Sequence, residues 1–318
     1  MRILYLPNEY SQQRQFQKKA NIYSVLMAME AKYYQERGHT VHWDNIQGTY
    51  DKIITEPEGL PFLSLPRLDR VLTRAMEYTS GDYKYLPGTH ILSANGCWWG
   101  KCKFCVERGL KYEVREVEDV IREIQVCQAL GFREIFDDSG TFPIGGWLDE
   151  FCKQIKNIDV HFSCNMRLVD LDYTKMRRSG FRMLLFGVES ANQETLDRIN
   201  KGTTTEDIKY LIKASEAGLE PHIAIMVGYP WETDEDSIRT LKLVRWLLRK
   251  GYAKTAQASF YTAEDGCNES QRKYVKKIYG VWKYPDFWFN KIKDINNVDD
   301  LKYLWLSIKK GVSECGLK

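Results

Sequence analysis

Three cysteines lie within nine residues of the sequence, in the segment Gly96-Cys97-Trp98-Trp99-Gly100-Lys101-Cys102-Lys103-Phe104-Cys105. Three thiolates on one loop can hold three irons of a cubane iron–sulfur cluster, and the fourth iron then lacks a protein ligand. A substrate can bind at that open position, so the cluster can take part in chemistry as well as carry electrons. The spacing therefore predicts a reactive metal centre with Cys97, Cys102 and Cys105 as its ligands.

A zinc site is the structural alternative for the same cysteines. Structural zinc is held by four ligands, which usually come as two pairs. The sequence has no second Cys-x-x-Cys pair and no His-x-His pair, so a single distant cysteine or histidine would have to complete the set. We therefore favour the iron–sulfur interpretation. A non-catalytic binding module stabilised by zinc is kept as the alternative.

Alternating strand and helix patterns surround the cysteine motif and predict the elements that position it. The predicted strands are His90–Ala94, Glu134–Asp137, Val160–Asn165, Arg182–Val188, His222–Val227 and Thr255–Phe260. The predicted helices are Val117–Leu130, Trp147–Ile155, Thr174–Arg178, Thr204–Ala217 and Glu235–Arg249. Glycines stand where four of these helices should end, at Gly131, Gly180, Gly218 and Gly251. The pattern indicates an α/β fold, a partial (β/α)6 barrel over residues 88–262, with the cysteine loop directly after its first strand.

Two further regions flank the predicted barrel. Residues 1–87 form a small α/β region and a connector, with strands at Arg2–Leu6, Thr40–Trp43 and Asp51–Thr55 and a helix at Ile22–Glu36. Residues 263–318 are predicted to be a helical extension, with helices at Glu269–Trp282 and Val298–Val312. We thus expect three parts, with the boundaries near residues 87 and 262.

Composition narrows the class of protein. The 318 residues are 43% hydrophobic and 28% charged, which is typical of a soluble globular chain and not of a disordered one. The net charge of +3 is too small to indicate binding to nucleic acid or to an anionic membrane. No apolar run approaches the roughly 20 residues of a transmembrane helix. Eight cysteines with a single cluster favour a reduced, cytoplasmic protein over a disulfide-bonded one.

Polar residues follow several predicted strands, and loops after the strands of a β/α barrel line its active face. Together with the cysteines, these segments resemble the radical S-adenosylmethionine (radical SAM) superfamily over about residues 88–260. Gly187-Val188-Glu189-Ser190 resembles that family's Gly-Val-Glu-Ser segment, and Gly228-Tyr229-Pro230-Trp231-Glu232-Thr233 resembles its Gly-x-Pro-x-Glu-Thr turn. The family's usual spacing is Cys-x-x-x-Cys-x-x-Cys, and this chain has one extra residue in the first gap.

The resemblance implies a [4Fe–4S] cluster and S-adenosylmethionine (SAM) as cofactors. It also implies that SAM is cleaved to a 5′-deoxyadenosyl radical, which abstracts hydrogen from a substrate. The residues that it assigns to SAM binding are Phe104, Asp137, Asp138, Asn165, Arg167, Glu189, Ser190 and Gly228. Within this set Phe104 would border the adenine, Asp137 would accept from the methionine ammonium, and Arg167 would pair with the carboxylate.

Simpler structural roles are open for some residues of the segments that follow the predicted strands. Ser139 could cap the next helix, Arg167 could pair with a surface acid, and Glu232 could only cap the helix that follows it. Cys267, in a loop after the last barrel strand, could donate a hydrogen atom or form a thiyl radical, or could be an incidental loop cysteine.

The residues of these motifs most resemble the branch of the superfamily that often carries a cobalamin-binding domain. Residues 1–87 are short for such a domain and lack an Asp-x-His-x-x-Gly motif, so we expect an enzyme that uses SAM alone. A radical SAM methyltransferase that uses cobalamin in trans is the alternative. The expected partners are an unidentified substrate (a small molecule, a peptide or a nucleotide) and an external electron donor such as flavodoxin or ferredoxin.

Overall fold

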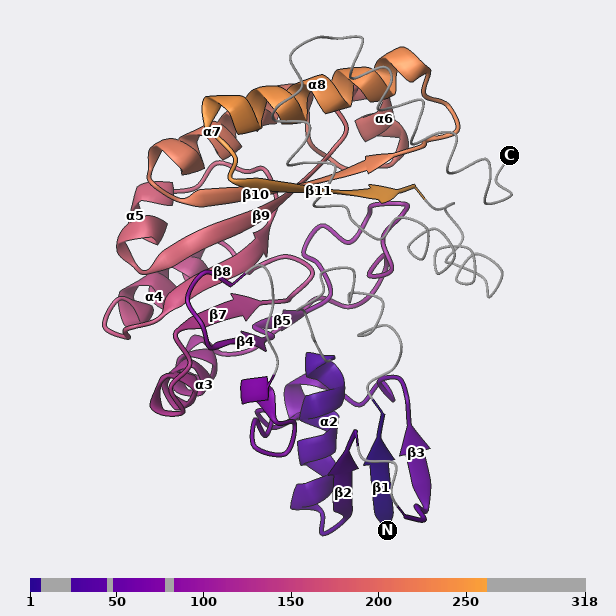
Figure 1. Ribbon diagram of the computed structural model, residues 1–318, viewed down its shortest axis with the longest axis vertical. Coiled ribbons are helices and arrows are strands. Elements are labelled where there is room, and N and C mark those ends of the chain that lie inside the picture. The colour runs from indigo at the N-terminus through magenta and orange to yellow at the C-terminus, as the bar shows by residue number, and fades with distance from the viewer. Residues whose placement is uncertain (7–23, 45–47, 78–82, 262–318) are drawn as a thin grey trace. The chain divides into compact units, whose positions relative to one another are not determined.

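The computed structural model describes residues 1–6, 24–44, 48–77 and 83–261, and it divides into two compact units (Figure 1). Unit 1 comprises residues 1–96 and 111–163, and unit 2 comprises residues 97–110 and the chain from residue 164. The cysteine loop thus belongs to unit 2. The predicted C-terminal helices and Cys267 lie outside the described residues.

The principal sheet has six strands in the order β11-β10-β9-β8-β7-β4, and the pairs β4–β7, β9–β10 and β10–β11 are parallel. The strand bounds are β4 Gly88–Ile91, β7 Glu134–Asp137, β8 His161–Met166, β9 Phe181–Glu189, β10 Glu220–Val227 and β11 Thr255–Phe260. Neighbours in the sheet are also successive in the sequence, as in a β/α barrel. The predicted α/β class with a parallel, partial-barrel sheet is confirmed.

Helices follow the strands. Their bounds are α3 Val117–Ala129, α4 Gly146–Ile155, α5 Tyr173–Arg178, α6 Gln193–Arg198, α7 Ile208–Glu216 and α8 Asp234–Lys250. Gly131, Gly180, Gly218 and Gly251, which were predicted as helix ends, all have positive φ. Helix α7 begins four residues later than predicted, because Thr205–Asp207 forms a 3-10 turn (η4).

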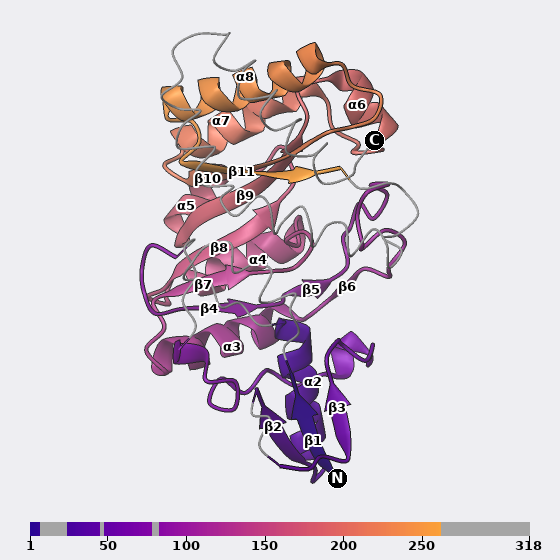
Figure 2. The ribbon, with the colours of Figure 1, turned by 45° about the vertical axis from the view of Figure 1, so that its right-hand side comes forward.

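In unit 2 the helices α5, α7 and α8 pack against β9 and β10 (Figure 2). Apolar side chains on these strands form the core, because β9 and β10 are buried along most of their length. Helix α8 begins at a capping box, in which the side chains of Thr233 and Asp236 each accept from the other's backbone N–H. Strand β9 ends at the predicted site residue Glu189, and β10 ends directly before the predicted site residue Gly228.

Unit 1 begins with the predicted βαβ region. Its parallel sheet has the order β2-β1-β3, and helix α2 packs against β2. The bounds are β1 Arg2–Tyr5, α2 Val25–Glu36, β2 Thr40–Trp43 and β3 Lys52–Ile54, followed by two 3-10 turns, η2 Phe62–Ser64 and η3 Ala75–Glu77. Unit 1 also contains a two-stranded antiparallel pair, β5 Ala94–Asn95 and β6 Glu113–Val114. Among the described residues, no helix is long and apolar enough to cross a bilayer.

Candidate functional site

The cysteine loop, residues 97–110, is built from tight turns. The backbone N–H of Cys105 donates to the carbonyl of Cys102 (3.2 Å), and that of Gly109 donates to the carbonyl of Gly100 (3.1 Å), which closes the loop on itself. Cys97, Cys102 and Cys105 all carry free thiols, and Cys102 is buried whereas the other two are partly exposed. The loop therefore presents three unpaired thiols from a backbone fixed by its own hydrogen bonds.

Burial raises the pKa of both Cys102 and Cys105, that of Cys105 to about 11. Positive charge on Lys201 and Arg167 opposes this rise at Cys102. Among the described residues, no three histidine, cysteine or acidic side chains lie close enough to hold one metal ion. A cubane cluster does not require that arrangement, because each thiolate binds a different iron. The donor set of three sulfurs beside two cations fits the cluster that the resemblance implies.

Two hydrogen bonds attach the cysteine loop to the segment after α6. The backbone N–H of Lys103 donates to the carbonyl of Ile199, and Trp99 Nε1 donates to the carbonyl of Asn200. The donor–acceptor distance is 2.9 Å in both bonds. Gly202 has a φ of +65°, and a side chain there would overlap the indole ring of Trp99. Only glycine satisfies both conditions, so Gly202 lets the Trp99 ring pack against the backbone.

Arg167 lies beside the cysteine loop with 5% of its surface exposed. One amino group is 3.9 Å from Cys102 Sγ, and the other donates to the carbonyl of Lys201. The guanidinium stacks near the rings of Trp98 and Trp99, at 5.2 and 5.0 Å from their centroids. Its Nε is buried without a hydrogen-bond partner. The alternative of a surface ion pair is therefore wrong, and the residue keeps one donor available for a ligand.

Lys201 and Glu189 form a buried ion pair, with Nζ 2.7 Å from Oε1 and with 8% and 9% of the side chains exposed. The pairing of β9 with β10 shifts register beside Glu189, whose φ is +62°. A non-glycine residue in that region is strained, and such strain often marks functional sites. A side chain at Gly187 would lie 2.6 Å from Glu189 Oε1 and 2.7 Å from Lys201 Nζ, so the glycine makes room for the pair. Lys201 also lies over the ring of Phe104 at 5.8 Å.

Glu232 joins the loops that follow β9 and β10. Its Oε1 accepts hydrogen bonds from Ser190 Oγ (2.9 Å), Thr195 Oγ1 (2.7 Å) and Asn192 Nδ2 (3.0 Å). The prediction that Glu232 only caps the next helix is wrong, because Thr233 occupies the N-cap of α8. The predicted site residue Ser190 is thus held in place by a carboxylate from the neighbouring loop.

An aromatic cluster stands beyond the end of β10. Tyr229, Trp231 and Tyr261 pack with their ring centroids 4.9–5.4 Å apart, and Phe104 packs against the same group. Gly228, which opens this turn, has a φ of +80°. Phe104 of the cysteine loop thus packs against the core cluster that contains Tyr229, the residue after Gly228, and the assignment of Phe104 and Gly228 to an adenine site stays a prediction.

Asp137 ends β7 in unit 1 and is fully buried. Its two oxygens accept from the backbone N–H groups of Ser93 (2.9 Å) and Ser139 (3.0 Å). Burial raises its pKa to about 6, although these hydrogen bonds lower it. Ser139 Oγ accepts from the N–H of Ala94 (2.9 Å), so the alternative of a helix cap is wrong, since Gly145 is the N-cap of α4.

Asp138 and Asn165 are the remaining predicted site residues. Asp138, which follows Asp137, is half-buried, and its backbone N–H donates to the carbonyl of Ile91 over 3.0 Å. Asn165 is half-buried near the end of β8, two residues before Arg167. Both lie at strand ends as expected, and their assignment to SAM stays a prediction.

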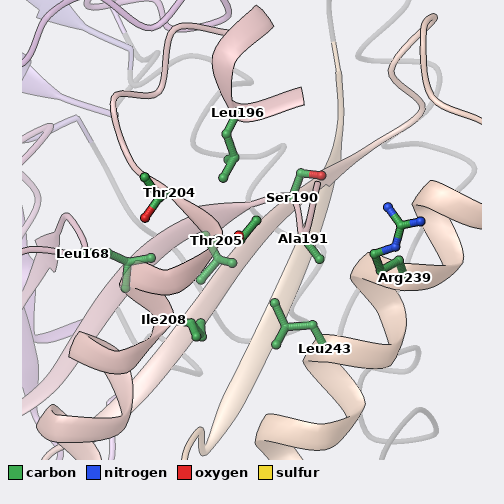
Figure 3. Close-up of a pocket in the computed structure, with 10 residues that line it drawn as sticks. Leu168, Ser190, Ala191, Leu196, Thr204, Thr205, Ile208, Arg239 and Leu243 are labelled. Atoms are coloured by element: carbon green, nitrogen blue, oxygen red, sulfur yellow. The ribbon is translucent and has the colours of Figure 1, made fainter. Parts of the chain in front are cut away.

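A pocket of about 230 Å³ lies in unit 2 between β9, α7 and α8 (Figure 3). Among the residues that line the pocket, Ser190 is the only predicted site residue. The hydroxyl of Ser190 donates to Glu232, which does not line the pocket. The lining residues are Leu168, Val188, Ser190, Ala191, Leu196, Thr204, Thr205, Ile208, Arg239 and Leu243. This pocket is thus lined by different side chains from those that surround the cysteine loop.

The sequence did not indicate the site roles of Lys201 and Glu232, and Glu232 was considered only within the motif turn and as a helix cap. Glu232 stands inside the Gly-x-Pro-x-Glu-Thr turn, and Lys201 stands 12 residues after Glu189. The signal that could have found Lys201 is its place between the predicted strand that ends near Glu189 and the predicted helix that begins at Thr204, since a lysine buried there needs an acidic partner. Its contact with Glu189 depends on a bulge in β9, which the sequence does not display.

Comparison with known proteins agrees with this geometry. Residues 91–244 match the family model of the radical SAM superfamily, so the chain carries a domain of that superfamily. Its members are enzymes, and the family implies a [4Fe–4S] cluster and SAM as cofactors. The resemblance drawn from the motifs is confirmed.

Three curated proteins are similar over part of their length. The anaerobic magnesium-protoporphyrin IX monomethyl ester cyclase of Rubrivivax gelatinosus is 28% identical over 211 residues, which cover 61% of this chain and 37% of the cyclase. An uncharacterized methyltransferase of Pyrococcus horikoshii is 26% identical over 49% of this chain and 36% of its own length. A putative methylthiotransferase of Methanocaldococcus jannaschii is 27% identical over 48% of this chain and 37% of its own length. The match thus spans little more than a third of each relative.

Among solved structures, the radical SAM methyltransferase TsrM of Kitasatospora setae, with cobalamin and a [4Fe–4S] cluster bound, is similar in fold. The TM-score is 0.50 at 20% identity, over 62% of this chain and 39% of TsrM. At this level of identity the likeness concerns the fold, and it agrees with the partial barrel described above.

Proposed function

We propose that this protein is an enzyme that cleaves SAM reductively and uses the resulting 5′-deoxyadenosyl radical to abstract hydrogen from an organic substrate. The observation that carries the proposal is the cysteine loop itself. Three free thiols stand on a self-closed loop inside the region that matches the radical SAM family, and two buried cations lie beside one of them.

Cys97, Cys102 and Cys105 would hold the [4Fe–4S] cluster, which supplies one electron for cleavage of the carbon–sulfur bond of SAM. Metal ligation requires thiolates, and although burial opposes their formation, the charges of Lys201 and Arg167 offset part of that cost at Cys102. The loop's hydrogen bonds to Ile199 and Asn200 keep the thiols in position.

Arg167 and Glu189 would orient SAM. The guanidinium Nε of Arg167 is buried and unpaired, and a carboxylate is the group that a guanidinium binds best. One oxygen of Glu189 accepts from Lys201, and its second oxygen would accept from a ribose hydroxyl. Ser190 Oγ donates to Glu232 and accepts from the backbone N–H and the side-chain amide of Asn192, so a contact with SAM would replace one of these bonds. Phe104 would border the adenine.

The test is anaerobic reconstitution with iron and sulfide, followed by SAM and dithionite. We expect about four irons per chain, and 5′-deoxyadenosine and methionine should form. The variant Cys97→Ala/Cys102→Ala/Cys105→Ala should retain no cluster. Its matched control is Cys127→Ala/Cys152→Ala/Cys164→Ala, which changes three buried cysteines outside the loop.

Two results would contradict the proposal. The first is full iron and sulfide in the loop variant, which would place the cluster elsewhere. The second is zinc without sulfide in the native protein, which would favour the binding-module alternative. A fully loaded protein that binds no SAM would contradict the roles of Arg167 and Glu189.

A further inference from the structure

The cysteine loop exposes two aliphatic side chains. Val106 directly follows Cys105 and has 81% of its surface exposed, and Leu110 has 51% exposed. Single exposed apolar residues are common and need no explanation. Here both stand on the loop that carries the predicted cluster ligands, which makes their exposure relevant to what the cluster contacts.

Backbone hydrogen bonds hold this part of the loop. The N–H of Arg108 donates to the carbonyl of Cys105 (3.1 Å), and that of Leu110 donates to the carbonyl of Glu107 (3.2 Å). Gly109 is bonded to Gly100, as described above. Val106 therefore projects from an ordered turn, and ordering it for binding costs little conformational entropy.

The cysteine loop that carries the two aliphatic side chains also has an excess of positive charge. Between Cys97 and Leu110 the chain carries three cations, Lys101, Lys103 and Arg108, and one carboxylate, Glu107. Lys101 and Arg108 are exposed, and the Lys101 ammonium lies 4.9 Å from the centre of the Trp99 ring. Exposed apolar side chains on a loop with excess positive charge fit a protein interface whose partner is acidic.

We propose that Lys101, Val106, Arg108 and Leu110 form the donor surface, the place where an acidic protein that carries one electron docks to reduce the cluster. This inference rests on the proposed function, which requires a supply of single electrons. Val106 and Cys105 are neighbours in the chain, with Cα atoms about 3.8 Å apart, so a partner on Val106 comes close to the cluster. The carrier is oxidised by one electron, the cluster is reduced by one, and that electron then cleaves the carbon–sulfur bond of SAM.

The experiment compares two reductants on the reconstituted protein. One is an acidic flavodoxin kept reduced by its NADPH-dependent reductase, and the other is dithionite, which needs no docking surface. For Lys101→Glu/Arg108→Glu we expect the flavodoxin-driven formation of 5′-deoxyadenosine to fall about tenfold, with a higher KM for flavodoxin. Val106→Glu should show a loss in the same direction. The dithionite-driven rate should stay within about twofold of wild type.

Matched controls separate docking from a general effect of charge. Lys242→Glu/Arg249→Glu makes the same charge change at two exposed positions of α8, and Val71→Glu puts a carboxylate at a valine of unit 1 that is 76% exposed. Both should keep the wild-type rate with either reductant. Iron, sulfide and the visible spectrum are recorded for each variant. Flavodoxin binding is also measured directly by biolayer interferometry at low and high salt.

The outcomes are distinguishable. Equal losses with both reductants would overturn the docking proposal, because the residues would then act on the cluster. Unchanged flavodoxin binding and rate in Lys101→Glu/Arg108→Glu would also overturn it. If the loaded wild-type protein cleaves no SAM even with dithionite, the proposed function fails, whatever the donor surface binds.

Discussion

Asp137 in unit 1 and Arg167 in unit 2 are both buried charged residues at strand ends, yet their hydrogen bonding differs. Both oxygens of Asp137 accept from backbone N–H groups, so its charge is compensated within its own unit. Arg167 contacts a cysteine sulfur and a carbonyl, and its Nε has no partner. A buried donor left unpaired costs free energy, and a ligand that pairs with it recovers that cost. We therefore expect unused hydrogen-bonding capacity to distinguish a ligand-binding charge from a structural one better than burial does.

The largest expected effect concerns the ion pair beside Arg167. Lys201→Met would leave Glu189 as a buried, unpaired carboxylate, and breaking a buried pair in this way costs about 3–5 kcal/mol. Urea unfolding of the apoprotein would measure it. The double variant Lys201→Met/Glu189→Gln should lose less stability than the two single variants added together. Additive losses would mean that the two side chains stabilise the fold independently.

The next effect separates backbone strain from loop displacement. Gly202→Ala introduces a methyl group into the Trp99 ring at a positive φ, whereas Gly251→Ala has a similar φ of +76° and no atom within 4 Å. We expect about 1–2 kcal/mol of destabilisation for Gly251→Ala and about 1–3 kcal/mol more for Gly202→Ala. Only Gly202→Ala should also lower the iron retained after desalting. Equal iron retention in both variants would show that Trp99 packing does not position the cysteine loop.

The sequence predicted the strands of the principal sheet because apolar runs bounded by glycine and polar residues mark buried parallel strands. The predicted bounds of β7 and β11 agree with the structure, and the other four strands differ by a few residues. Helix α6 was not predicted. It has six residues, and a helix that short depends on tertiary packing more than on its own sequence pattern.

The candidate site was predictable where spacing along the chain defines it. The three cysteines and Glu189 stand in local motifs, so the sequence displays them directly. The pairing of Lys201 with Glu189 and the network at Glu232 join residues 12 and about 40 positions apart. Such contacts depend on which loops meet after folding and on the bulge in β9, and local sequence patterns predict neither of these.

A smaller effect on stability is expected at Asp137, whose two oxygens are both hydrogen-bonded within unit 1. Asp137→Asn replaces one acceptor by an amide donor, which leaves a backbone N–H of Ser93 or Ser139 unpaired at a cost of about 1–3 kcal/mol. Burial raises the pKa of Asp137 to about 6. Because the unfolded chain releases this proton near its ordinary pKa of about 3.9, the native protein binds it more tightly. The stability from this group is therefore complete below pH 4 and is lost as pH rises through 6.

The penalty of Asp137→Asn should accordingly be about 1 kcal/mol larger at pH 5 than at pH 7. Urea midpoints at the two pH values measure the difference, and Asp170→Asn, which changes an exposed carboxylate paired with Lys213, serves as the control. A penalty that does not vary with pH would mean that Asp137 is ionised throughout this range. A loss of SAM affinity in the same variant would support the assignment of Asp137 to the cofactor.

The smallest effect on stability, and the most direct test of the comparison, is expected at Arg167. Arg167→Lys keeps the charge but loses the planar fork that contacts the Lys201 carbonyl and stacks near Trp98 and Trp99. We expect about 1 kcal/mol of destabilisation and a rise of about tenfold in the Kd for SAM, equivalent to about 1.4 kcal/mol. Arg239→Lys, at an exposed arginine of α8, should leave SAM affinity unchanged. Isothermal titration of the reconstituted proteins measures both constants. If the two variants bind SAM equally well, the unpaired Nε of Arg167 does not serve the cofactor, and unused hydrogen-bonding capacity fails to identify the ligand-binding residue in this protein.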